Sequence, residues 1–299
     1  MAENAPSSIT GALRQRAEVV AATLPPLLIH AERVASTVAQ GVHGRRRVGQ
    51  GETFWQFRRY QPGDPANRID WRRSAKSQRT FVRETEWEAA QSVWLWRDVS
   101  PSMNYRSSNQ LDTKADRSTL LLLATATLLL RGGEHVALLG VDRVPHSGRA
   151  ALHHLTAALG GKPGPLDSDG LPIPERLPRY AELVLFSDFL MPFERIEQTV
   201  KRFAAGGING HLVQVLDPAE EDLPFSGRTR FEGLEREGDV TFGRAERLRG
   251  DYANRLAALR EGLTSLTRRI GWTYSSHRTD VPPERPLLSL YVTLGNEAS

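Results

Sequence analysis

The stretch that decides the fold of this 299-residue chain is residues 92–103, SVWLWRDVSPSM. Its first part, Ser92–Trp96, is a short apolar run, and such a run predicts a strand buried on both faces. The strand passes into a loop of the pattern Asp-x-Ser-x-Ser, formed by Asp98, Ser100 and Ser102. In an open α/β sheet ligands bind beyond the carboxyl ends of the strands, so a site is expected at this loop.

The sequence after this strand alternates between apolar strands and helices. The spacing predicts strands over 135–141, 183–186, 211–216 and 272–276, and helices over 114–130, 149–159, 193–205 and 246–269. Apolar strands that alternate with helices indicate a parallel sheet with helices on both faces. We therefore expect a doubly wound, mostly parallel α/β domain over residues 91–299, with a β-hairpin inserted near 228–242.

Two further regions precede this domain. Residues 1–44 are expected to form a disordered tip followed by a helical arm, with helices near 11–23 and 27–40. Residues 45–90 form a basic segment, which we expect to pack on the α/β domain. The chain is thus predicted to have one main domain and two N-terminal additions.

The composition excludes several classes of protein. With 39% hydrophobic and 25% charged residues, the chain has the composition of a globular protein rather than a disordered or fibrous one. It has no cysteine, which excludes disulfides, thiolate metal sites and cysteine nucleophiles. The longest apolar run, Leu120–Leu130, is too short to span a bilayer, and the N-terminus does not resemble a signal peptide. We expect a cytoplasmic protein without membrane insertion.

Positive charge is concentrated in one part of the chain. Residues 45–83 contain eleven Lys and Arg against three acidic residues, a net charge of +8, whereas the whole chain carries +4. Six aromatic residues are interleaved with these charges, and two of them, Tyr60 and Trp71, are expected to pack the segment against the sheet. Such a segment can act as a structural brace, bind an acidic partner or bind nucleic acid.

A second strand end carries another acidic residue. The predicted strand over 183–186 is followed, after one serine, by Asp188, and parallel strands end at the same edge of a sheet. Together with the Asp-x-Ser-x-Ser loop, Asp188 would offer two carboxylates and two hydroxyls. These are hard oxygen ligands that suit Mg²⁺ or another divalent cation. The alternative is that Asp98 or Ser100 only caps the backbone of its own loop.

Two patterns resemble known families. The Asp-x-Ser-x-Ser loop, followed about ninety residues later by a strand-terminal Asp, resembles the metal-ion-dependent adhesion site of von Willebrand factor A-type domains. Residues 57–76, FRRYQPGDPANRIDWRRSAK, are more specific and closely resemble the signature of the bacterial family catalogued as domain of unknown function fifty-eight. Members of that family carry an A-type domain and are typically encoded beside MoxR-type AAA+ ATPases. The resemblance covers about residues 40–295 and includes the stretch LDPAE at 216–220.

The resemblance implies a von Willebrand factor A-like fold and assigns roles to the candidate site. The Asp-x-Ser-x-Ser loop supplies metal-site residues, and Asp188 is the distal carboxylate. A-type domains also supply a Thr from an intervening loop, but residues 160–170 contain none. In its place Ser168 could offer a hydroxyl, and Asp167 or Asp169 a carboxylate. This departure leaves a degenerate site, with weak or no metal, as an open alternative.

The resemblance also implies a function in protein interaction. We expect a non-enzymatic adaptor that works with a MoxR-type AAA+ ATPase, or with its client proteins, in assembly or maturation of other proteins. The ion would take a carboxylate of the partner into its open coordination position. Candidate partner-binding residues are arginines of the basic segment: Arg58, Arg59, Arg68, Arg72 and Arg73. The alternative function is a nucleic-acid-binding module that uses residues 45–83.

Motifs of known enzyme classes are absent from the sequence. It contains no Gly-x-Ser-x-Gly, no P-loop Gly-Lys-Ser/Thr and no His-Glu-x-x-His. A metal-dependent hydrolase would need a general base beside the ion, and the sequence identifies none. His153 and His154 fall inside a predicted helix without a nearby acidic partner, so we expect them at the helix surface or core edge rather than at a metal.

Overall fold

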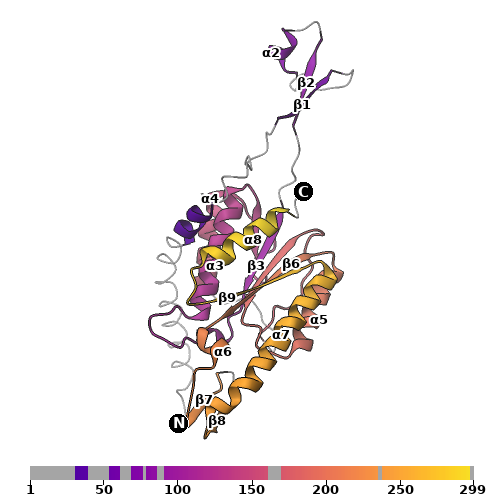
Figure 1. Ribbon diagram of the computed structural model, residues 1–299. Helices are drawn as coiled ribbons and strands as arrows, with labels where there is room; N and C mark the ends of the chain where they lie inside the picture. Colours follow the sequence, from indigo (N-terminus) through magenta and orange to yellow (C-terminus); the bar gives the residue numbers. More distant parts are fainter. Residues whose placement is uncertain are drawn as a thin grey trace, which may run out of the picture.

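The chain forms an α/β structure around a five-stranded sheet (Figure 1). The computed structural model describes residues 31–39, 54–60, 69–76, 79–85, 91–160, 170–234 and 238–296. The predicted N-terminal tip, the predicted helix over 11–23, Arg68 and Ser168 lie outside these residues. Among the described helices, none combines the length and the apolar character that crossing a membrane requires.

All neighbouring strands of the central sheet are parallel, in the order β4-β3-β5-β6-β9. The strands are β3 (Ser92–Arg97), β4 (His135–Leu138), β5 (Glu182–Ser187), β6 (Asn209–Leu216) and β9 (Thr273–Arg278). The chain runs from β3 to the edge strand β4 and then crosses to β5 on the other side of β3. This reversal is the topological switch point at which doubly wound sheets bind ligands. The predicted doubly wound α/β fold class is confirmed.

Helices cover both faces of this sheet (Figure 1). One face carries the helix over 31–39, α3 (Lys114–Arg131), α4 (Gly148–Gly160) and α8 (Glu284–Asn296); the other carries α5 (Phe193–Ala205) and α7 (Arg249–Ile270). Val93 and Leu95 of β3 belong to the first core, whereas Trp94 and Trp96 belong to the second. Because side chains alternate between the faces of a strand, β3 is apolar throughout, as its sequence predicts.

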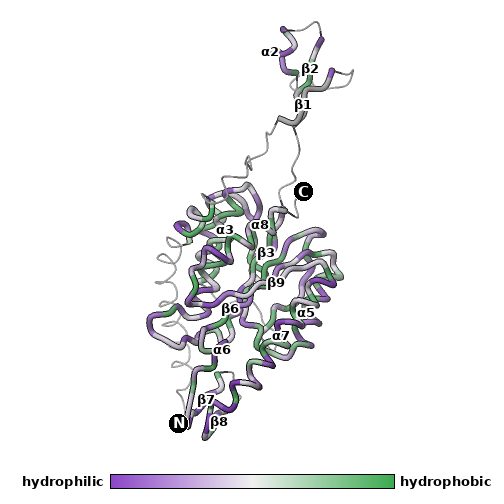
Figure 2. The backbone as a smooth tube through the Cα atoms, in the orientation of Figure 1, coloured by the Kyte–Doolittle hydropathy of each residue, from purple (hydrophilic) through white to green (hydrophobic). Residues whose placement is uncertain are grey.

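The helix α3 is buried along most of its length. Leu120–Leu123 are at most 1% exposed, so this part of the helix is covered on all sides rather than along one stripe. In Figure 2 α3 carries long hydrophobic stretches, whereas α7 shows more hydrophilic ones. Thr113 caps the first turn by accepting the N–H of Asp116 on Oγ1. This cap and the surrounding core position Lys114, the first residue of α3.

Within the described residues, the other elements predicted for the α/β domain agree with the structure, but the helix at its C-terminal end was not predicted. The hairpin expected near 228–242 is confirmed as the antiparallel pair β7 (Thr229–Glu232) and β8 (Asp239–Phe242), and it precedes the short helix η3 (Ala245–Leu248). No helix was predicted for the segment that forms α8. Pro286 lies in the first turn of α8, where its missing N–H has no helical partner to lose, so a proline there is compatible with a helix.

The basic segment forms a small unit of its own. β1 (Phe54–Arg59) pairs antiparallel with β2 (Phe81–Thr85), and the one-turn helix α2 (Trp71–Ser74) lies between them in the chain. Trp71 is 67% exposed and Tyr60 is 40% exposed. Both side chains face solvent on this unit. Packing of the segment on the α/β domain stays a prediction.

Gly210 in β6 lies against the ring of Trp272. A Cβ at position 210 would lie 2.4 Å from Cε3 of this tryptophan. The ring is 4% exposed, and its Nε1 donates to the carbonyl of Ile208 at 2.8 Å, so it cannot move aside freely. We expect Gly210→Ala to lower the free energy of unfolding by about 1–3 kcal/mol in urea denaturation. The control is Gly243→Ala, where a Cβ meets no atom within 4 Å; equal stability of the two variants would contradict the prediction.

Candidate functional site

The carboxyl ends of β3 and β5 bring the predicted metal-site residues together. Asp98 and Ser100 lie on the loop after β3, Ser102 lies in the short helix η2 (Pro101–Asn104), and Asp188 follows β5. The Oγ atom of Ser102 is 3.1 Å from Oγ of Ser100 and donates to Oδ2 of Asp188 at 3.1 Å. The side chains thus meet at one edge of the sheet. Their role as metal ligands stays a prediction.

Asp98 is buried and holds the loop in place. Its Oδ1 accepts the N–H of Ser100 at 2.7 Å, and its Oδ2 accepts the hydroxyl of Ser187 at 2.8 Å. Burial raises the pKa of Asp98 to about 6; hydrogen bonds from Ser100 and Ser187 oppose this shift, and the nearby charge of Asp188 adds to it. The expected backbone cap is therefore present at Asp98. It is compatible with a cation, because a positive charge beside Asp98 would favour its ionised form.

A lysine that the sequence analysis did not assign lies within this group. Lys114 is 0% exposed. Its Nζ donates to Oδ2 of Asp188 at 2.7 Å and to Oε1 of Glu220 at 2.5 Å. Burial alone would lower the pKa of Lys114, but the two carboxylates outweigh burial and raise the pKa above its ordinary value. The site therefore contains a charged ammonium between two acidic residues.

Glu220 reaches the site from the end of a third strand. It lies in the short helix α6 (Pro218–Asp222), directly after β6. Its Oε2 accepts the N–H of Asp217, while Asp217 accepts the N–H of Ala219 on Oδ1, which completes a capping box. The other oxygen of Asp217 accepts the N–H of Ser107 at 2.9 Å. These bonds tie α6 to the loop after η2 and direct Oε1 of Glu220 toward the lysine.

The sequence contains a signal for Glu220 and another for Lys114. Asp217 follows an apolar strand as Asp98 and Asp188 do, and this places Glu220, three residues later, near the same edge of the sheet. The sequence analysis assigned this stretch only to the family signature. A lysine at the start of α3 is unfavourable beside the positive end of the helix dipole, which indicates that nearby acids hold it. The contacts themselves join residues 74 and 106 positions apart, so they depend on the fold.

The donor set fits a hard divalent cation, with one complication. Two carboxylates and two serine hydroxyls are the oxygen ligands that Mg²⁺ binds. However, Oδ2 of Asp188 already accepts from both Lys114 and Ser102, and its Oδ1 accepts the N–H of Leu190 at 3.0 Å. A cation would therefore share Asp188 with the ammonium of Lys114.

Gly170, the last residue of the segment expected to supply the remaining ligand, lies beside this group. A Cβ at Gly170 would lie 3.3 Å from Cβ of Ser100 and 3.7 Å from Oδ1 of Asp98, so the backbone after residue 169 passes beside the site. Gly170 has a φ of +78°, a conformation that favours glycine. Ser168 lies outside the described residues, so its role as the remaining ligand stays a prediction.

Three of the candidate partner-binding arginines have side chains that the structure describes, and these three lie outside this group. Arg72 and Arg73 lie in α2, and Arg59 ends β1; all three side chains are exposed. Arg58 is described only as a backbone position of β1. Their contact with a partner stays a prediction.

Comparison with known proteins identifies relatives of unknown function. Uncharacterized proteins of Mycobacterium bovis (Mb1516) and Mycobacterium tuberculosis (Rv1480) are each 28% identical over 276 residues, which cover 87% of this chain and 85% of the relative. A crystal structure of the conserved hypothetical protein BatB from Bacteroides thetaiotaomicron aligns with a TM-score of 0.37 and 13% identity, over 69% of this chain and 100% of that chain. Residues 56–262 match the model of the family described as "Protein of unknown function DUF58". The chain therefore belongs to the DUF58 family.

Proposed function

We propose that this protein is a non-enzymatic protein-interaction adaptor. Its binding centre is the edge of the sheet formed by Asp98, Ser100, Ser102 and Asp188, which would hold Mg²⁺ or another divalent cation. Bound there, the ion would supply an open coordination position for a carboxylate oxygen of a partner protein. The partner we propose is a MoxR-type AAA+ ATPase or one of its client proteins.

The observation that carries this proposal is the contact between two strand ends. Ser102 after β3 and Asp188 after β5 lie within 3.1 Å of each other although they are 86 residues apart. The surrounding charge also supports a cation, because the cluster contains the carboxylates of Asp98, Asp188 and Glu220 and the ammonium of Lys114 contacts two of them. Ser102 is only half-buried, so this side of the cluster is open to a partner.

Lys114 affects how strongly the proposed site binds a cation. Its ammonium offsets part of the negative charge of Asp188 and Glu220 without an ion, so the loops can hold their positions when no ion is bound. The same ammonium repels a second cation that approaches Asp188, and this lowers the affinity of the site for Mg²⁺. We therefore propose a weak, readily exchanging ion rather than a permanent structural one.

A titration with Mg²⁺ tests the ion. We expect wild type to bind Mg²⁺ and Ser102→Ala to bind it at least about tenfold more weakly, since loss of even an indirect metal partner has this effect. Ser226→Ala is the matched control, because Ser226 is exposed and lies just before β7. If Ser102→Ala and Ser226→Ala bind Mg²⁺ equally, the metal-dependent form of the proposal is wrong.

Co-purification tests the partner. A MoxR-type ATPase produced in the same cell should be retained by wild type and by Ser226→Ala but not by Ser102→Ala. Replacing Arg72 and Arg73 by Glu reverses two charges on α2 and should also weaken retention if this surface contacts the ATPase. Equal retention by all variants would exclude both surfaces as the binding site.

A further inference from the structure

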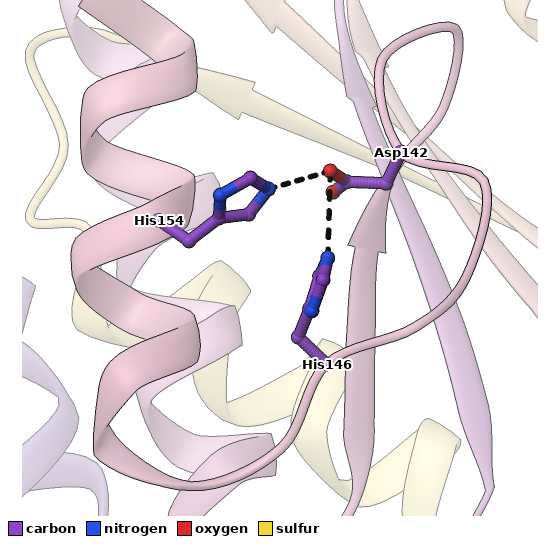
Figure 3. A group of neighbouring side chains, drawn as sticks. All are labelled: Asp142, His146 and His154. Carbon is purple, nitrogen blue, oxygen red and sulfur yellow. Dashed lines mark hydrogen bonds and ion pairs between the residues drawn. The ribbon is translucent and has the colours of Figure 1, made fainter.

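A second group of polar side chains lies beyond the end of β4. Asp142 and His146, from the loop between β4 and α4, and His154, from α4, point toward one another (Figure 3). His154 was expected to have no acidic partner, and this expectation is wrong, because its Nε2 lies 2.6 Å from Oδ1 of Asp142. Asp142 lies in the loop between β4 and α4. The pair forms because α4 packs back against β4. His153, in contrast, is exposed at the helix surface as expected.

The three side chains direct their ligand atoms to a common point. Nε2 of His146 lies 3.7 Å from the same oxygen of Asp142, and the three ligand atoms all lie within 4.8 Å of one another. The two imidazole rings are 4.5 Å apart and tilted by 54°. Side-chain exposure is 4% for Asp142, 39% for His146 and 45% for His154. The group is thus anchored on a buried carboxylate and open to solvent on the histidine side.

Besides their contacts with one another, the three residues are each held in place by the surrounding fold. Asp142 accepts the N–H of Leu138 at 2.7 Å on Oδ2, which leaves Oδ1 facing the rings. The backbone of His146 exchanges two hydrogen bonds with Val136 in β4, at 2.7 and 2.8 Å. His154 lies in α4, which is anchored in the core by Leu152 and Leu155. Such separately supported ligands need little rearrangement to bind an ion.

We propose that Asp142, His146 and His154 form a binding site for a late first-row divalent cation, in the first place Zn²⁺. Two imidazole nitrogens and one carboxylate are a common Zn²⁺ ligand set, with the fourth position left to water or to an external ligand. The group is less suited to Mg²⁺, which prefers an all-oxygen octahedral shell.

One of the observed separations is already close to what tetrahedral Zn²⁺ requires. Bonds of about 2.0–2.1 Å place neighbouring ligand atoms about 3.4 Å apart. The separation between Asp142 and His146 is 3.7 Å, whereas the hydrogen-bonded pair of Asp142 and His154 at 2.6 Å would have to open. Ligation requires an unprotonated Nε2 on both histidines, so any proton on these atoms leaves to solvent as the ion binds.

This site is chemically distinct from the proposed Mg²⁺ site. Asp98 follows β3 and Asp142 follows β4, and these strands are parallel neighbours, so both sites lie at the carboxyl edge of the sheet. One offers oxygen atoms alone, and the other offers two nitrogens and one oxygen. A bound Zn²⁺ would link α4 to the loop that follows the edge strand β4.

A titration of untagged protein with Zn²⁺ against a chromophoric chelator tests the proposal. We expect wild type to bind one equivalent, and His146→Ala and His154→Ala each to bind at least about tenfold more weakly. His153→Ala is the matched control, since it removes the adjacent exposed histidine of the same helix, and it should bind as wild type does. Melting curves without metal verify that the variants fold.

Substitution of Co²⁺ gives a readout that needs no variant. Wild type loaded with one equivalent of Co²⁺ should show the visible absorption of a four- or five-coordinate site, and excess Zn²⁺ should remove it. Absence of this absorption in wild type, or equal Zn²⁺ affinities of wild type and the double variant His146→Ala/His154→Ala, would overturn the proposal. Loss of Mg²⁺ binding by Ser102→Ala with Zn²⁺ binding retained would show that the two sites are independent.

Discussion

Replacing Lys114 by Met should lower the free energy of unfolding by about 3–5 kcal/mol at neutral pH without divalent cations. The change removes the ammonium that contacts Asp188 and Glu220 but keeps most of the aliphatic chain. Both carboxylates then remain in the interior without their cation, and an uncompensated buried charge is costly. Urea denaturation of wild type and variant measures the difference.

A surface lysine provides the matched control for this substitution. Lys201 pairs with Glu197 at 3.0 Å within α5, but its side chain is 56% exposed. Exposed pairs contribute little, so Lys201→Met should change the free energy of unfolding by about 0.5 kcal/mol or less. An equal, small loss in both variants would show that Lys114 contributes no more than a solvent-exposed residue.

The Lys114→Met variant also tests the proposed ion. If Lys114 and Mg²⁺ share Asp188, then removal of the ammonium should tighten Mg²⁺ binding, and Mg²⁺ should recover part of the lost stability. The same Mg²⁺ concentration should stabilise wild type less. A variant that Mg²⁺ does not stabilise more than wild type would contradict the shared site, even if the loss of stability itself is as predicted.

Lowering the pH from 8 to 4.5 should reduce the stability contributed by His277 by about 2–3 kcal/mol. This side chain is 4% exposed, and its Nε2 lies 3.2 Å from Nη1 of Arg117. Burial lowers the pKa of His277 from 6.5 to about 4; the charge of Arg117 adds to the shift, and Asp280 opposes it. The native state therefore binds fewer protons than the unfolded state between these pKa values. The stability that the neutral form of His277 contributes is fully present above pH 6.5 and is lost as the pH falls toward 4.

A comparison of variants isolates this histidine from the carboxylates, which titrate in the same range. The free energy of unfolding of His277→Gln should fall less between pH 8 and 4.5 than that of wild type, because Gln does not titrate. His153→Gln, which replaces an exposed histidine, should follow wild type. If the three proteins lose stability in parallel, the low pKa of His277 is wrong.

The sequence predicted the elements of the core well because the signals are local. Runs such as Ser92–Trp96 and Leu120–Leu130 are apolar on every side, and only a segment covered on both faces has this composition. The position of the site residues was predictable for the same reason, because residues that directly follow a parallel strand lie at the carboxyl edge of the sheet. The segment that became α8 was missed, because Pro282 and Pro283 before it and Pro286 in its first turn read as signals for a loop.

What the sequence by itself determined is therefore the doubly wound core and the convergence of the Asp-x-Ser-x-Ser loop with Asp188. Only the tertiary structure decided which charges meet there. Lys114 contacts acids from two other strand ends, and His154 contacts Asp142 only because α4 packs back on the edge strand. The physical reason is that burial and strand direction are encoded in neighbouring residues. An ion pair or a ligand group, in contrast, depends on distances of a few ångströms that the packing of whole helices sets.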